Sequence, residues 1–281
     1  MTLSAVLRAN PAGRVIKTPL LLYKENYISV IIMGNILSAG QGMNTSRQVS
    51  IGAGLPIETP AFTINRVCGS GLQTVALAAL AIKAGDADAI IAGGTENMNQ
   101  APFYLQKARY GYRMGMPKDE IVDGMVYDGL WDIFNDYHMG VTAENLAEAY
   151  NIPKEEQDEF AYKSQMKCKD AMESGKFKDE IVPVMIQQRR GDPISFETDE
   201  HPKPDTTIEG LERLRGVFKV GGTVSAGNAS GINDGAAAVL VTSEKKARDL
   251  GLEPIATIAA YDVAEGTTGT IGIDTISKNT R

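Results

Sequence analysis

The chain has 281 residues, of which 43% are hydrophobic and 22% are charged, and it carries a formal net charge of −7. This composition indicates a globular protein with a sizeable core, and the negative charge argues against a basic nucleic-acid-binding surface. No apolar run approaches the roughly 20 residues of a membrane span, and the N-terminal stretch contains too short an apolar segment for a secretory signal.

The first hundred residues alternate short apolar strands with apolar helices. Strands are predicted at 27–35 and 60–65, followed by a helix at 70–84 and a buried strand at 89–97. This strand–helix–strand order predicts a parallel crossover connection. The helix has almost no polar side chain before its last turn, so we expect it to be buried on nearly all sides.

The middle of the chain has a different character, because all of the net negative charge falls within residues 101–231. A short helix is predicted to begin at a Thr142 cap. A second helix begins near Pro153, carries two glutamates in its first turn and ends before Gly175. Residues 185–225 are rich in proline, glycine and charge, and we expect them to be mostly loop.

Apolar elements return after the middle segment. A buried strand is predicted at 235–241, a helix capped by Ser243 follows, and another strand is predicted at 255–261. The similarity of these elements to those of the first hundred residues predicts that the two segments belong to one domain.

We therefore predict an α/β fold with a layered αβα domain built from two separate segments. These segments are residues 1–100 and 232–262, and residues 101–231 form a large irregular insertion between them. Residues 263–281 show no clear period.

Cys68 lies between a predicted strand and the predicted helix at 70–84, in the stretch INRVCGSGLQTV. The start of a helix offers unpaired amide N–H groups and a partial positive charge, which would stabilise a thiolate and a developing oxyanion. Gly69 and Gly71 leave room for a substrate to approach. These features suit a nucleophile, but free cysteines are more often buried and unreactive, so a packing thiol at a tight turn stays open from the local pattern alone.

The second cysteine, Cys168, shares a helical stripe with Phe160, Ala161, Ser164 and Ala171, which predicts a packing face and no chemistry. Two cysteines in unrelated contexts give no disulfide framework and favour a reducing compartment such as the cytoplasm. We predict no metal site and no membrane association.

Several separate stretches resemble the thiolase family, and within it the acetyl-CoA acetyltransferases. They include IMGNILSAGQGMNTSRQ, the segment INRVCGSGLQTVALAALAIKAGDADAIIAGGTENMNQAPF, DGLWDIFNDYHMG and GGTVSAGNASGINDGAA. The resemblance runs from about residue 33 to residue 260. It implies a thiolase-like fold with a mixed sheet, and it implies that the matching Cys68 attacks an acyl-CoA thioester and carries the acyl group.

The resemblance further implies that residues of the insertion, here a loop domain, bind coenzyme A. The residues at matching positions are His138, Met139, Lys203, Phe218, Ala226 and Ser230. The coenzyme A thioester would be the substrate, and no other cofactor is expected. The residues themselves allow simpler readings, because His138 could be a packing histidine at a turn and residues 225–231 a turn before a strand.

Coenzyme A is a polyanion, so its binding to an acidic insertion would depend on local cations. Lys203, Arg213 and Arg215 are candidates, although such residues are more often solvated surface. His201, in a proline-flanked stretch, is expected to be exposed. Glu96 follows a Gly-Gly turn, where a carboxylate is more often structural than catalytic.

Thiolase chemistry needs further groups, which in the family lie in a second domain. These are a second cysteine as the base, a histidine in a Gly-His-Pro motif and an Asn-Glu-Ala-Phe motif. The sequence ends at Arg281 before any of them, and residues 263–281 would be the start of that domain. The stretch LSAVLRANPAGRV, residues 3–15, resembles the first strand of the family only vaguely. We expect a chain that is unstable, aggregating or dependent on a partner.

Two hypotheses of function follow. In the first, the protein is an acetyl-CoA acetyltransferase that forms or cleaves acetoacetyl-CoA through an acyl-cysteine, as a homo-oligomer or together with a complementing C-terminal thiolase domain. In the second, it is a non-catalytic acyl-CoA-binding or assembly module, or a degenerate thiolase fragment. A ketoacyl synthase fits less well, because the CGSG turn and the YHMG segment match thiolases better.

Overall fold

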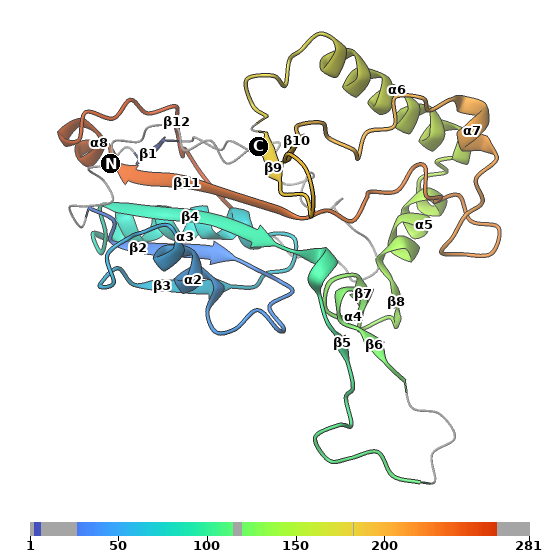
Figure 1. Cartoon of the computed structure of the whole chain (residues 1–281), viewed down its shortest axis with the longest axis horizontal. Helices are drawn as coiled ribbons and strands as arrows, with labels where there is room; N and C mark the ends of the chain where they lie inside the picture. Colours follow the sequence, from blue (N-terminus) through green and yellow to red (C-terminus); the bar gives the residue numbers. More distant parts are fainter. Residues whose placement is uncertain (1–2, 7–26, 115–119, 182, 263–281) are drawn as a thin grey trace. The chain divides into compact units, whose positions relative to one another are not determined.

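The computed structural model describes residues 3–6, 27–114, 120–181 and 183–262. These residues form two compact units (Figure 1). Unit 1 contains the described residues up to Gly129 together with Asn233–Asp262, and unit 2 contains those of Leu130–Ile232. Along the chain, the two units meet at residues 129/130 and 232/233. The domain boundaries predicted from the sequence, at residues 100 and 231, stay predictions.

Unit 1 is built on a mixed six-stranded sheet in the order β12-β1-β11-β4-β2-β3. Strand β2 runs parallel to both β3 and β4, whereas β11 is antiparallel to β4 and to β1. The predicted parallel crossover from β3 to β4 is therefore confirmed. The strands are β1 (Leu3–Val6), β2 (Val30–Gly34), β3 (Ala61–Ile64), β4 (Ala89–Glu96), β11 (Gly235–Ser243) and β12 (Ala256–Thr257).

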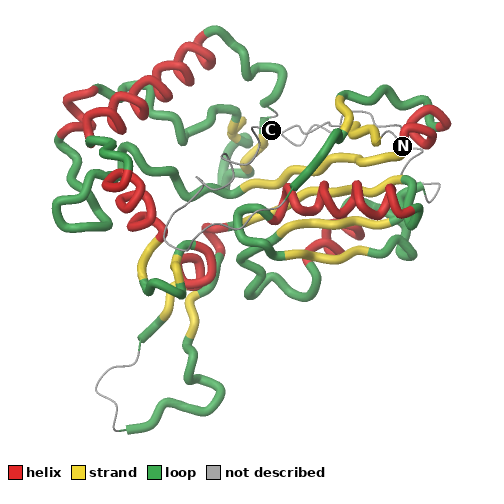
Figure 2. Tube along the Cα trace, turned by 180° about the vertical axis from the view of Figure 1, so that it is seen from behind, coloured by secondary structure: helices red, strands yellow, loops and turns green. Residues whose placement is uncertain are grey.

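Two helices cover opposite faces of this sheet (Figures 1 and 2), which confirms the predicted α/β layering. Helix α3 (Ser70–Ala84) packs on the face that carries Ile32 and Ile90, and α2 (Thr45–Gly52) lies on the face that carries Ile31. Neighbouring residues of β2 face opposite ways because side chains alternate along a strand. Each face therefore has its own apolar core.

The prediction that α3 is buried on nearly all sides is wrong. Ala78, Ala79 and Ile82 are buried in the core, but Leu72 is 78% exposed and Leu80 is 47% exposed. One face of the helix packs on the sheet, and Leu72 and Leu80 lie on a face that the described residues leave open to solvent.

Residues 67–84, which include α3, are long and apolar enough to cross a membrane by length and composition alone. This corrects the expectation that no apolar run approaches that length. The core helix of a globular protein meets the same criterion, and α3 does pack on a sheet.

Several shorter elements complete unit 1. Gly85 ends α3 in the left-handed conformation, as a C-terminal glycine commonly does. Ser243 caps α8 (Glu244–Asp249) as predicted, but the predicted strand at 255–261 shortens to β12. The remaining elements are η1 (Met98–Gln100), β5 (Phe103–Tyr104), β6 (Val122–Asp123) and α4 (Gly124–Gly129).

Unit 2 is helical at its centre. Helix α5 (Met139–Ala149) is capped by His138, so the predicted Thr142 cap is wrong, and Thr142 is buried within the helix. Helix α6 (Lys154–Glu173) follows Pro153 as predicted. The segment expected to be mostly loop, residues 185–225, contains α7 (Ile208–Glu212) and most of a hairpin of β9 (Val184–Ile186) and β10 (Ile194–Phe196). A second hairpin, of β7 (Trp131–Asp132) and β8 (Tyr137–His138), precedes α5.

The packing face predicted for α6 is not covered by the residues that the structure describes. Phe160 is 77% exposed, and the exposure of Cys168 is intermediate. Asp158, a charged residue, is the buried residue of the helix. The apolar stripe on α6 therefore does not form a core, and a polar contact anchors the helix instead.

Candidate active site

Cys68 lies in the turn between β3 and α3, one residue before the Gly69 cap of the helix. The residue is exposed, so the alternative of a buried packing thiol does not hold. The strand places the turn at the edge of the sheet, and the helix directs its first N–H groups toward the same region. An attacking thiol and a set of hydrogen-bond donors therefore come from one short segment.

The backbone of this turn is held by side chains on both sides of Cys68. Asn65 Oδ1 accepts a hydrogen bond from Val67 N at 2.9 Å. Ser70 Oγ accepts one from Arg66 N at 2.8 Å and donates one to Val67 O at 2.6 Å. Val67 itself has a φ of +47°, a conformation that costs a β-branched residue about 1–3 kcal/mol.

Gly34 allows the start of α3 to lie directly on the end of β2. A Cβ at this position would be 2.7 Å from the carbonyl carbon of Ser70 and 2.8 Å from Gly71 N. The Thr74 hydroxyl donates to Gly93 O at 3.1 Å and fixes the next turn of the helix to β4. The absence of a side chain at residue 34 therefore determines where the Cys68 turn sits.

Glu96, at the end of β4, has a structural role. Its carboxylate accepts hydrogen bonds from Ile36 N at 2.9 Å, Leu37 N at 2.8 Å and Asn35 Nδ2 at 3.0 Å. These contacts hold the loop that follows β2. Glu96 therefore holds the loop in place, which agrees with the structural role that the sequence favours for this carboxylate.

In unit 2, His138 and Phe218 form a stacked pair. Their ring centroids are 4.8 Å apart with an interplanar angle of 18°. A Cβ on Gly140 would lie 2.2 Å from the Phe218 ring, so the glycine makes room for the pair. Met139 begins α5 directly after His138. Three neighbouring positions that the resemblance implies for coenzyme A thus lie together.

Burial lowers the pKa of His138 below its ordinary value of 6.5, and the neutral ring caps α5. Its Nδ1 accepts a hydrogen bond from Gly140 N at 3.0 Å, which leaves Nε2 to carry the proton. An imidazolium could not accept this bond. The helix start therefore depends on the neutral form.

We expect acidification from about pH 7.5 to 5.5 to destabilise unit 2 through His138. The pKa of the folded state is lowered, so this contribution is complete above the unfolded value of 6.5 and is lost as the pH falls through the folded value. Thermal unfolding at both pH values checks this. In His138→Asn, which keeps a good helix cap, the fall in melting temperature should be smaller, and equal falls would contradict the assignment.

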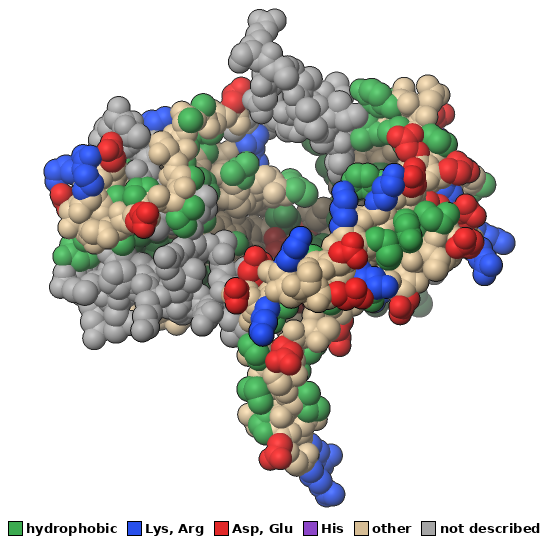
Figure 3. All heavy atoms as spheres, turned by 90° about the horizontal axis from the view of Figure 1, so that it is seen from above, with side chains coloured by type: hydrophobic (Ala, Val, Ile, Leu, Met, Phe, Trp, Pro, Cys, Tyr) green, Lys and Arg blue, Asp and Glu red, His purple; other side chains and the backbone are tan. Residues whose placement is uncertain are grey.

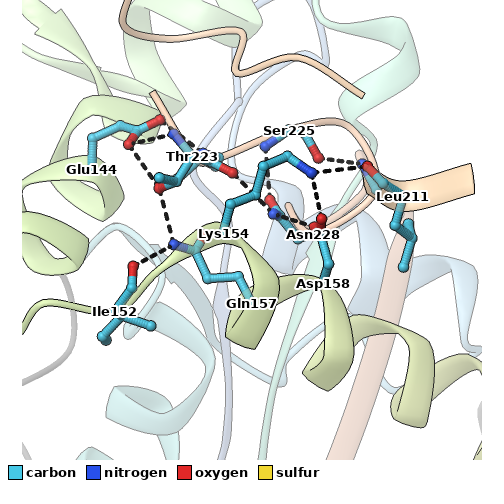
Figure 4. A network of polar contacts seen from close by, with 11 residues as sticks. Glu144, Ile152, Lys154, Gln157, Asp158, Leu211, Thr223, Ser225 and Asn228 are labelled. Atoms are coloured by element: carbon cyan, nitrogen blue, oxygen red, sulfur yellow. Dashed lines mark hydrogen bonds and ion pairs between the residues drawn. The ribbon is translucent and has the colours of Figure 1, made fainter. Parts of the chain in front are cut away.

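A loop at residues 223–230 carries Ala226 and Ser230, and α5 and α6 hold it through a polar network (Figure 4). Glu144 is 4% exposed. Its carboxylate accepts hydrogen bonds from Thr223 N at 2.9 Å, Thr223 Oγ1 at 3.0 Å and Val224 N at 2.8 Å. Burial alone would raise the pKa of Glu144, but these bonds outweigh it and the pKa is lowered.

Helix α6 supplies the second part of the network (Figure 4). Asp158 is buried, and its Oδ1 accepts from Asn228 Nδ2 at 2.9 Å, while Oδ2 pairs with Lys154 Nζ. Asn228 Oδ1 in turn accepts from Ser225 N at 2.7 Å. Gln157 Nε2 donates to Thr223 Oγ1 at 2.9 Å. Ala226 and Ser230 are exposed on the loop that these contacts hold.

The candidate cations lie at the surface of unit 2. Lys203 Nζ donates to Glu200 O at 3.1 Å, and Arg213 and Arg215 are exposed, as is His201. Basic and acidic side chains are interspersed on the face shown in Figure 3. No contact links Lys203 with His138, so its place in a coenzyme A site stays a prediction.

Among the described residues, no cluster of three or more His, Cys, Asp and Glu residues could hold a metal ion. Cys68 and His138 belong to different units, so the structure supports two separate groups of candidate residues. One is the Cys68 turn, and the other is the His138–Phe218 pair with the loop at 223–230.

Sequence reasoning missed the residues that hold these groups in place. Val67 and Gly34 carry no local signal of their conformation or contacts. Glu144 and Asp158 look like surface residues of helices, and their partners lie 79 and 70 residues further along the chain.

The chain is similar to known proteins over most of its length. Residues 15–245 match the family model described as the thiolase N-terminal domain. A curated acetyl-CoA acetyltransferase of Syntrophomonas wolfei is 55% identical over 258 residues, and one of Pseudomonas aeruginosa is 52% identical over 254 residues. These alignments cover 92% and 90% of this chain but 64% of each relative.

The fold of the chain is similar to a crystal structure of the Bacillus anthracis acetyl-CoA acetyltransferase. The TM-score is 0.77 at 37% sequence identity, and the match covers 90% of this chain and 68% of that structure. The chain spans slightly less than two thirds of the length of the curated relatives that it matches.

Proposed function

This chain belongs to the thiolase family, and from that premise we propose that it is an acyltransferase of thiolase type that carries an acyl group on Cys68. The observation that supports the proposal best is the exposed Cys68 at the start of α3. The names of the relatives favour acetyl-CoA as the acyl donor, and acetoacetyl-CoA as the product of condensation or the substrate of thiolysis.

In the proposed first step, the sulfur of Cys68 attacks the carbonyl carbon of an acyl-CoA thioester. The new carbon–sulfur bond forms, the bond to the coenzyme A sulfur breaks, and the proton of the Cys68 thiol passes to the departing coenzyme A. Backbone N–H groups at the start of α3 would stabilise the oxyanion of the intermediate. The step needs no metal and no redox cofactor, because it exchanges one thioester for another.

We propose that unit 2 binds the coenzyme A part of the donor. The neutral, half-buried His138 and the stacked Phe218 offer an apolar surface, and the exposed Ala226 and Ser230 leave space for the narrow pantetheine arm. Met139 and Lys203 complete the proposed set. No residue of this chain is assigned to the base that would remove a proton from a second acyl-CoA.

The proposal includes a partner surface on α3. Its exposed Leu72 and Leu80 would be covered by another thiolase domain or by a second copy of the chain. An exposed, reactive thiol also suits a reducing compartment, and we place the protein in the cytoplasm.

Acid-quenched labelling tests the function. The chain is incubated with acetyl-CoA that is radiolabelled in the acetyl group, quenched in acid and mapped by peptide. We expect label on Cys68, its loss in Cys68→Ser and its retention in Cys168→Ser. Label without thiolysis of acetoacetyl-CoA would assign acyl acceptance alone to this chain. Binding of coenzyme A without label would favour the non-catalytic module instead.

Alkylation provides an independent check of the thiol. Iodoacetamide below pH 8 should modify Cys68 at least about tenfold faster than Cys168, because Cys68 is exposed at a helix start and Cys168 is partly covered on α6. Peptide mapping at timed intervals measures both rates in one sample. Equal rates would contradict an activated thiol at residue 68.

A further inference from the structure

Val67 adopts a backbone conformation that its side chain disfavours. Four described residues other than glycine have a positive φ, and the other three are Asn44, Asp136 and Asn151. Asparagine and aspartate tolerate the left-handed region, whereas a β-branched residue there is an outlier. The outlier lies directly before Cys68, so its cause bears on the reactive turn.

Two polar side chains hold Val67 in this conformation. Asn65 Oδ1 binds its N–H at 2.9 Å, and Ser70 Oγ binds its carbonyl oxygen at 2.6 Å. Ser70 is buried and lies against Gly34, so its hydroxyl cannot easily move away. Both backbone polar groups of Val67 are therefore fixed by side chains on either side of it.

The conformation of Val67 determines what the turn presents to solvent. Gly69 N donates to Arg66 O at 3.1 Å and Ser70 N donates to Val67 O at 3.0 Å. Cys68 lies between the two acceptors and the two donors of these bonds and is exposed. Rotation of Val67 to an extended φ would break the Ser70 contacts and change the direction of both the N–H and the thiol of Cys68.

We propose that Val67 is a positioning residue whose left-handed backbone, held by Asn65 and Ser70, aims the thiol and the N–H of Cys68 at the acyl donor. Its importance for acyl transfer rests on the proposed function, but its effect on the accessibility of the thiol does not. Backbone strain at a reactive residue persists only where surrounding contacts enforce it. Ser70 is the strongest of these contacts, because it binds the turn twice.

Three variants of the full chain test this. Ser70→Ala removes both contacts, and we expect Cys68 alkylation by iodoacetamide to slow about tenfold as Val67 relaxes. Val67→Asn keeps the left-handed conformation without strain and should react within about twofold of the original chain. The double variant should recover most of the lost rate, because asparagine holds the conformation without the Ser70 contacts.

A purely structural role for Ser70 would not be rescued by a change at residue 67. A double variant as slow as Ser70→Ala, or a Ser70→Ala variant as fast as the original chain, would overturn the proposal. If Ser70→Ala does not fold, the exposed Asn65 allows the same comparison between Asn65→Ala and Asn65→Ala with Val67→Asn.

Acetyl labelling of the same variants separates the two proposals. If the original chain takes no acetyl label while the alkylation rates follow the expected order, the proposed function fails and the positioning role of Val67 stands. If label appears on Cys68 but the double variant shows no rescue in either assay, the positioning role alone is overturned.

Discussion

Gly34→Ala is expected to destabilise unit 1 by about 3 kcal/mol and to abolish acetyl labelling of Cys68. The added Cβ would lie 2.7 Å from the carbonyl carbon of Ser70, and backbone atoms of a helix start cannot give way as a flexible side chain can. Either α3 or β2 must shift, and Cys68 moves with the helix start. A fall in melting temperature of roughly 10 °C measures the effect.

Gly71→Ala is the matched control for this prediction. Gly71 lies in the first turn of the same helix, and a Cβ there would have no heavy atom within 4 Å. Alanine is favoured over glycine in a helix by about 1 kcal/mol, so stability should be unchanged or slightly higher. If both variants melt at the same temperature as the original chain, the close approach of α3 to β2 does not exist in solution.

Glu144→Ala is expected to destabilise unit 2 by about 3–5 kcal/mol. The substitution removes the acceptor of the N–H groups of the half-buried Thr223 and the buried Val224, and donors left without a partner in such places are costly. Because the pKa of Glu144 is lowered, its contribution is complete above the unfolded value of 4.5 and is lost as the pH falls through the folded value. Chemical unfolding at pH 7 and below pH 4 checks both statements.

Glu148→Ala provides the comparison on the same helix. Glu148 pairs with Lys219 at 2.9 Å, but both side chains are largely exposed. Such a pair contributes about 1 kcal/mol or less. A loss of stability in Glu148→Ala as large as that in Glu144→Ala would show that the network around Thr223 is not what holds unit 2 together.

The sequence predicted the order of apolar elements well because that information is local. Short apolar runs indicated the strands of unit 1, and Ser243 indicated the start of α8. The N-terminal cap of α5 was misplaced because His138 is an unusual cap, and Thr142 four residues later is a common one. The extent to which α3 is buried could not be read from its composition, because that depends on what covers its outer face.

For the candidate site, the residues predicted to react or bind came from the pattern around Cys68 and from the resemblance. The residues that support them did not, because their roles depend on contacts between distant segments. Glu144 meets Thr223 across 79 residues, and Gly34 meets Ser70 only after two elements have folded. Val67 shows no sign of its conformation in its identity, since a β-branched residue is poorly suited to a positive φ.

The loop at residues 223–230 is ordered before any ligand arrives, because Glu144 of α5 binds its backbone and Asp158 of α6 binds the side chain of Asn228. A ligand that contacts such a loop does not have to immobilise it, so the loss of chain entropy on binding is small. The free energy of each contact then appears as affinity rather than being offset by ordering. The hydrogen bonds of Glu144 and Asp158 would thereby affect how tightly a flexible ligand arm is bound, although neither carboxylate needs to touch it.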